Sequence, residues 1–302
     1  MSQGVSSPKK NPQSLTTLKK LLLNCKALPK AGIYFVKERF GMVKPVKSKL
    51  VFVISFPRSG THALGSLVSQ ENIGFRYHGE FFAFNHWSSV IERLNRYYPF
   101  FSFRFYLNFK TQRQKWRTYR FESSSLNASK TMRAIKKIHG IHIIKVFPTH
   151  LSDPVLEAII AENKPHIIFL RRNHLDRFVS HKKANKTGKW HTASTESVEI
   201  DIDEAELNKF IDEYEKFYIR YVNFAKAHGC AVLDVDYETL QDANVIDSIQ
   251  HFAAWEGFTD YNKLAKIPTT AKQDSSRTVQ DNYLASSGKK ISDFDFKKIE
   301  VN

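Results

Sequence analysis

A continuous apolar run, Leu50–Ile54, leads directly into the loop Ser55–His62 and then into an amphipathic segment. Strands that are buried on both faces of a parallel sheet have this unbroken apolar pattern. Leu64 and Leu67 recur with helical spacing, so we expect a strand, a loop and a helix in that order. This unit limits the fold strongly, because a strand buried on both faces needs neighbouring strands and covering helices.

The rest of the chain supplies such strands and helices. Three more apolar runs follow, and segments with helical spacing separate them. This alternation predicts the α/β class, with a central parallel sheet flanked by helices. Ligands of such sheets bind at the carboxyl ends of the strands. We expect strands at 50–54, 141–146, 166–170 and 231–235, a short helix after Pro154, and longer helices at 174–187, 203–228 and 243–256.

The net charge of +16 is concentrated in two stretches. Residues 1–49 hold 11 Lys and Arg against one acid, and residues 91–137 hold 12 against two. Local basic surfaces indicate an anionic partner, such as a phosphorylated nucleotide, an acidic glycan or lipid, a membrane surface or nucleic acid. We interpret 1–49 as a basic N-terminal extension able to touch an anionic membrane, and 50–302 as the main domain, with an inserted region at about 85–137.

The two cysteines, Cys25 and Cys230, give neither a metal-binding spacing nor a disulfide framework. We therefore expect no metal in the site and a reducing, cytoplasmic location. The chain has no run of 18 apolar residues, and its polar first residues do not resemble a signal peptide.

The loop Ser55–His62 has the composition of a phosphate-binding turn. Gly60 permits a tight turn, and backbone N–H groups at the start of the next helix can bind an anion. Arg58 adds a cationic fork, and the hydroxyls of Ser59 and Thr61 add hydrogen-bond donors. The pattern G-x-x-x-x-G-K-[ST] is absent, which disfavours the alternative of a P-loop-like kinase or nucleotide hydrolase.

A second cationic segment, Arg171–Ser180, follows the strand expected at 166–170. Arg172 at the strand end and Ser180 on the next helix are eight residues apart, so a guanidinium and a hydroxyl can meet at one phosphate. A polyanion-binding protein without chemistry is the other alternative. The sequence contains no nucleic-acid-binding signature, so we expect no nucleic-acid partner.

Together the two segments resemble the nucleotide-binding signature of the sulfotransferases that use PAPS (3′-phosphoadenosine 5′-phosphosulfate). In that family the first loop holds the 5′-phosphosulfate, and an R-N-P-x-D-x-x-x-S-like segment holds the 3′-phosphate. The present segment reads R-N-H-L-D-R-F-V-S, with His174 at the usual proline. Arg58 stands where cytosolic members usually carry Lys, and P-R-S-G-[ST] is common in bacterial carbohydrate and glycolipid enzymes of the lipopolysaccharide or nodulation-factor type.

The resemblance implies a P-loop-NTPase-like fold, PAPS as donor, PAP (adenosine 3′,5′-bisphosphate) as product, and a carbohydrate or glycolipid acceptor that is neutral or anionic. It implies that Arg172 and Ser180 hold the 3′-phosphate. Tyr237 belongs to a segment similar to the family's Y-E-x-L element and is a candidate for stacking on adenine. Lys272 and Arg277 resemble a C-terminal K-Q-x-x-x-R segment that closes over the nucleotide.

The resemblance also assigns catalytic roles. Glu80 is the expected general base, because related bacterial enzymes have a Glu shortly after the first helix. The adjacent residues Phe81 and Phe82 predict an apolar setting that raises the Glu80 pKa toward neutrality. His78 and His62 are rival bases.

Two cations complete the expected catalytic set. Arg58 is expected to balance charge on the leaving phosphate. Lys145, near the end of the strand at 141–146, is expected to contact the sulfonate oxygens or the acceptor.

Overall fold

The computed structural model describes residues 48–68, 75–82, 141–188, 197–240, 242–253 and 277–296, together with Met132, Ile135, Lys136, Trp190 and Thr195. All of them belong to one compact unit, formed by residues 46–86 and 119–302. Nearly all of the N-terminal extension and most of the inserted region lie outside the described residues. The expected domain boundaries therefore stay predictions.

Five parallel strands form the central sheet, in the order β2-β3-β1-β4-β5. β1 lies in the middle and pairs with β3 from Lys49↔Ile141 onward and with β4 from Val51↔His166 onward. The α/β class with a parallel sheet is thus confirmed, and the short strand β2 was not predicted. The strands are β1 (Lys49–Ile54), β2 (Phe75–Tyr77), β3 (Ile141–Val146), β4 (His166–Arg171) and β5 (Val232–Asp236).

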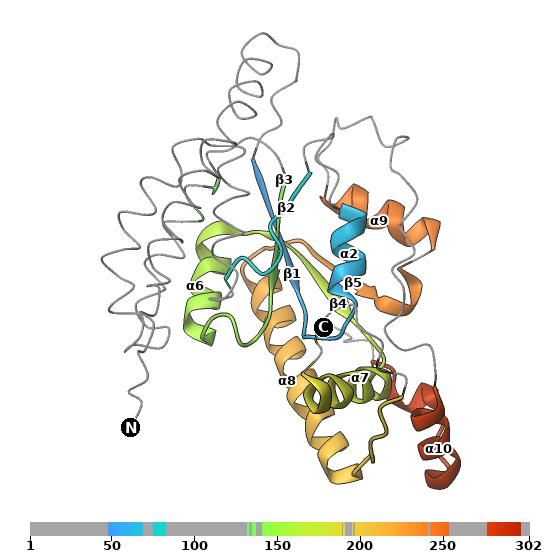
Figure 1. Ribbon diagram of the computed structural model, residues 1–302. Helices are drawn as coiled ribbons and strands as arrows, with labels where there is room; N and C mark the ends of the chain where they lie inside the picture. The colour runs from blue at the N-terminus through green and yellow to red at the C-terminus, as the bar shows by residue number, and fades with distance from the viewer. Residues whose placement is uncertain are drawn as a thin grey trace, which may run out of the picture. The chain divides into compact units, whose positions relative to one another are not determined.

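Helices cover both faces of the sheet, with α6 and α8 on one side and α2 and α9 on the other (Figure 1). None of the helices in the described part of the chain has the length and apolar character needed to cross a bilayer. The helices are α2 (Thr61–Val68), α6 (Asp153–Asn163), α7 (His174–Thr187), α8 (Glu204–Ala227), α9 (Ala243–Ala253) and α10 (Thr278–Ser287), and short 3₁₀ turns occur at η3 (Tyr237–Thr239) and η5 (Ile291–Phe294).

Alternating strand residues build a core on each face of the sheet. Val51 of β1 packs in a cluster with Leu64 of α2 and Ile249 of α9. On the other face the ring of Phe169 lies 5.6 Å from the ring of Tyr218 on α8. Burial on both sides explains why the strands read as unbroken apolar runs rather than as alternating ones.

Local signals fix the two helices nearest the site. The Asn173 side chain caps α7 by accepting hydrogen bonds from the N–H groups of Leu175 and Asp176, and Gly188 ends that helix with a φ of 68°. Asp203 caps α8 in the same way. The Asn173 cap starts the first turn of α7 directly after β4, where the cationic segment begins.

Candidate active site

The loop between β1 and α2 needs a glycine at position 60 for two reasons. The backbone of Gly60 has a φ of +82°, which side-chain-bearing residues rarely adopt. The ring of Tyr237 also lies so close that a Cβ on Gly60 would be 1.9 Å from Tyr237 Cδ2. The Gly60 carbonyl then accepts the N–H of Leu64 and starts α2. A backbone turn ending in helix N–H groups is a suitable cradle for an anion.

Arg58 joins this loop to the cationic segment. Its backbone has a φ of 71°, a strained conformation for a residue other than glycine. Arg172 Nη1 donates to the Arg58 carbonyl (2.9 Å), and Arg58 Nε donates to Ser180 Oγ (2.9 Å). The structure thus brings Arg58, Arg172 and Ser180 together, and the Arg58 guanidinium reaches toward the segment that the resemblance assigns to the 3′-phosphate.

The guanidinium groups of Arg58 and Arg172 lie close together at this loop. Burial lowers the pKa of Arg58, and the charge of Arg172 lowers it further. The Arg172 guanidinium lies 4.9 Å from the ring centroid of Tyr237, and its buried Nε has no hydrogen-bond partner among the described residues. A phosphate supplies the acceptors and the negative charge that this arrangement favours.

Glu80 and Lys145 form an ion pair beside the loop. The backbone N–H of Lys145 donates to the Gly79 carbonyl, so the residues after β2 continue to pair with β3. This pairing brings Lys145 Nζ to 2.7 Å from Glu80 Oε1 and to 3.4 Å from Thr61 Oγ1. Lys145 is 2% exposed, so it is a buried cation rather than a lysine that extends into solvent.

The pKa of Glu80 is lowered, and the expectation of a raised pKa is wrong. Burial alone would raise this pKa, and Phe81 and Phe82 are indeed buried. The contact with His150 and the charge of Lys145 outweigh the burial and hold the Glu80 pKa well below its usual value. The carboxyl group is therefore ionised at neutral pH and can accept a proton without first losing one.

His150 contacts the second oxygen of the same carboxylate. The N–H of Phe147 donates to His150 Nδ1 (3.1 Å), so a neutral imidazole carries its proton on Nε2. That Nε2 lies 3.7 Å from Glu80 Oε2. Nothing in the sequence indicates that the turn after β3 carries His150 back to Glu80.

The two rival bases lie in different environments. His62 is exposed on the first turn of α2. His78 is 1% exposed, its ring stacks on that of His142, and its Nε2 lies 3.0 Å from His142 Nδ1. The structure places Glu80 at Lys145, whose ammonium group also reaches Thr61.

The expected contacts of the C-terminal segment with the nucleotide stay predictions. Lys272 lies outside the described residues. Arg277 precedes α10, and its Nη1 donates to Asp176 Oδ2 on the first turn of α7 (3.2 Å). The structure does not bring Arg277 to Arg58 or Ser180.

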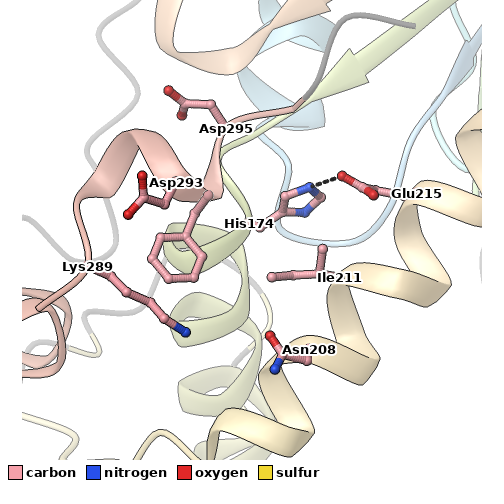
Figure 2. Close-up of a pocket in the computed structure, with 8 residues that line it drawn as sticks. His174, Asn208, Ile211, Glu215, Lys289, Asp293 and Asp295 are labelled. Carbon is pink, nitrogen blue, oxygen red and sulfur yellow. Dashed lines mark ion pairs between the residues drawn. The ribbon is translucent and has the colours of Figure 1, made fainter. Parts of the chain in front are cut away.

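His174, at the position of the usual proline, lines a pocket of about 290 Å³ between α7, α8 and η5. Its imidazole points toward Glu215, with Nε2 and Oε1 3.4 Å apart (Figure 2). Burial lowers the His174 pKa to about 3, and the charges of Arg177 and Arg171 contribute. No residue of the loop Ser55–His62, here called the donor loop, lines this pocket. We therefore interpret the pocket as separate from the anion-binding turn of that loop.

Two tyrosines of α8 form hydrogen bonds at or next to the loop Ser55–His62. Tyr214 and Ser59 share a hydrogen bond between their hydroxyls (2.8 Å). Ser55 Oγ and Tyr218 OH both donate to the Leu170 carbonyl. Nothing in the sequence indicates that the hydroxyls of these tyrosines reach this part of the structure.

A turn suited to an anion at the carboxyl end of the central strand, next to converging arginines, is typical of proteins that bind a phosphorylated nucleotide. The chain matches the family model described as the sulfotransferase domain over residues 48–294, and it belongs to that family. It is a PAPS-dependent sulfotransferase, which decides against the kinase and polyanion alternatives. No curated protein matches the chain.

Among the described residues, no three His, Cys, Asp or Glu side chains gather where they could hold a metal ion. The expectation that catalysis needs no metal stays a prediction.

Proposed function

We propose that this sulfotransferase transfers the sulfuryl group of PAPS to a hydroxyl of a carbohydrate or glycolipid, with Glu80 as the general base. The observation that carries the catalytic proposal is the Glu80–Lys145 pair beside Thr61, at the start of α2. It combines a proton acceptor and a buried cation at the carboxyl end of the sheet. In the reaction the acceptor oxygen bonds to sulfur, the bridging S–O bond breaks, PAP leaves, and the hydroxyl proton passes to a base.

The lowered pKa of Glu80 is compatible with this role. An alcohol is far less acidic than Glu80, but it becomes strongly acidic as its oxygen bonds to sulfur. Proton transfer to Glu80 is therefore favourable late in the step. Lys145 serves the same step, because its ammonium group can attract the sulfonate oxygens while it orients Glu80.

The arginines and the loop hold the nucleotide in this proposal. Arg172 and Ser180 bind the 3′-phosphate, and Arg58, which contacts both, balances charge on the leaving nucleotide. Ser59, Gly60, Thr61 and His62 surround the 5′-phosphosulfate. Tyr237 is proposed to stack on adenine, a role that it would have to combine with its packing on Gly60.

The tail is proposed to complete donor binding. Lys272 and Arg277 close over the nucleotide, and Arg277 would exchange Asp176 for a phosphate when it does so. The Arg277 side chain is exposed to solvent in its contact with Asp176, so breaking this contact costs little free energy.

The acceptor proposal rests on sequence features. The P-R-S-G-T loop and the Glu base resemble bacterial carbohydrate and glycolipid enzymes rather than cytosolic ones. The region 91–137 holds 12 cations and many aromatic residues, a composition suited to an anionic glycan. We further propose that the inserted region shapes the acceptor site and that the basic stretch 1–49 contacts anionic membrane surfaces in the cytoplasm.

Donor binding and catalysis can be tested separately. Calorimetric titration should give tight binding of PAP, much weaker binding of adenosine 5′-monophosphate, and loss of that difference in Arg172→Ala. Glu80→Gln should bind PAP as the wild type does but lose roughly 10²–10⁴-fold in turnover. A Glu80→Gln enzyme with wild-type turnover would remove Glu80 from the mechanism.

The acceptor class needs a panel assay with ³⁵S-labelled PAPS. Neutral oligosaccharides, anionic oligosaccharides and glycolipids should be compared with a simple phenol and a steroid alcohol. Transfer to sugars is expected. Transfer only to the phenol or the steroid would contradict the carbohydrate proposal and leave the sulfotransferase assignment intact.

A further inference from the structure

Arg177 is a buried cation beneath the donor loop. It is the fourth residue of α7, and only 2% of its surface is exposed. Its guanidinium carbon lies 3.5 Å from the ring centroid of Tyr214, 3.8 Å from that of Phe210 and 4.8 Å from that of Phe56. Three aromatic faces therefore surround this charge.

Within the described ranges no carboxylate forms an ion pair with Arg177, and its buried Nε has no hydrogen-bond partner. Burial lowers its pKa to about 10, with opposing contributions from Tyr214 and Tyr218, so the group remains charged at neutral pH. A charge held in this way costs free energy in the folded protein. Packing alone would be satisfied by an apolar side chain of similar length.

The aromatic faces around Arg177 connect it to the site. Phe56 belongs to the donor loop itself, and Tyr214 binds Ser59 of the same loop through its hydroxyl. The charge of Arg172 acts on both Arg58 and Arg177. Three guanidinium groups thus lie around one loop, and the charge of Arg172 disfavours the charges of the other two.

We propose that Arg177 is a positioning residue for the donor: its buried charge strengthens binding of the nucleotide phosphates and lowers the stability of the protein without nucleotide. The proposal rests on the donor placement given above. Arg177 acts through the loop and need not touch the donor. Because the charge is surrounded by protein, bulk salt screens it less than it screens an exposed cation.

Arg177→Met tests the proposal, because methionine keeps an unbranched side chain that packs well on aromatic rings but removes the charge. The thermal midpoint without nucleotide should stay the same or rise, since replacing a buried ion by an apolar residue is often neutral or stabilising. The dissociation constant for PAP, measured by calorimetry, should rise at least about 10-fold, and the loss should persist at high salt.

Two further variants serve as controls. Arg177→Lys keeps the charge and should bind PAP nearly as well as the wild type. Arg220→Met removes an exposed arginine of α8 that pairs with Asp153 and Glu157, and it should leave PAP affinity unchanged.

Several results would overturn the proposal. An unfolded or clearly less stable Arg177→Met protein would make Arg177 a structural anchor, and unchanged PAP affinity would remove its link to the donor. Equal loss of affinity in Arg177→Lys and Arg177→Met would exclude charge as the cause. If the wild type itself does not prefer PAP over adenosine 5′-monophosphate, the donor placement fails, and the proposal fails with it for that separate reason.

Discussion

Glu80→Gln should destabilise the protein at neutral pH, apart from its effect on catalysis. The substitution removes the carboxylate that lies 2.7 Å from Lys145 Nζ, and the side chains of Lys145 and Glu80 are only 3% and 20% exposed. Breaking a fully buried pair costs about 3–5 kcal/mol, and we expect about 2–3 kcal/mol here because Glu80 is partly solvated. For a chain of this size that is a fall of roughly 5–10 °C in the thermal midpoint.

The pH dependence provides the stronger test. The pKa of Glu80 is lower in the folded protein than its ordinary value of 4.5, so its stabilising contribution is complete above about pH 5.5 and declines as the pH falls below 4.5. At pH 3.5 the wild type should have lost about 1.4 kcal/mol of this contribution, whereas the glutamine variant has none to lose. The difference in unfolding free energy between the wild type and Glu80→Gln should therefore become smaller as the pH falls from 7 to 3.5.

Urea unfolding at pH 7, 5 and 3.5 measures this difference directly. Glu213→Gln, at an exposed position of α8, is the matched control and should follow the wild type at every pH. A Glu80→Gln protein as stable as the wild type at pH 7 would refute the reasoning. So would a stability difference that does not change with pH.

Three other substitutions test the loop and the core. Gly60→Ala should weaken PAP binding at least about 10-fold in calorimetry, because it forces a left-handed alanine against Tyr237; wild-type affinity would contradict this. Tyr214→Phe removes the hydroxyl bonded to Ser59 and should cost about 1 kcal/mol in urea unfolding and a few-fold in PAP affinity. Ile159→Ala should cost about 2–4 kcal/mol and leave PAP affinity unchanged, and a changed affinity would link α6 to the site.

The sequence predicted the long elements well, because each has a strong local signal. The unbroken apolar runs marked β1, β3, β4 and β5, and the predicted bounds of α7 agree with the structure. The strand β2 was not predicted, because three residues are too few to show a pattern of apolar and polar positions. The helix α10 was not predicted, because its apolar residues do not form a clear face.

The sequence suggested candidate residues for the site but not their contacts with one another, and the roles of these residues stay predictions. Arg58 and Ser180 were both identified, yet their direct hydrogen bond depends on how α7 folds back on the loop. The predicted direction of the Glu80 pKa shift was wrong. Lys145 and His150 lower this pKa, and they come close to Glu80 only because the residues after β2 pair with β3 and the chain turns after β3. Phe81 and Phe82 are buried beside Glu80, as their sequence suggests, but this apolar setting does not decide the direction of the Glu80 pKa shift.

The position of β1 in the middle of the sheet also has a consequence for biosynthesis. Lys49 pairs with Ile141, which is synthesised 92 residues later, and the β4 partner follows later still. At 5–20 residues per second, a ribosome needs roughly 5–20 s to produce that first partner. During this interval the apolar strand has no sheet to join, so chaperone dependence and aggregation during expression should be governed by this one strand.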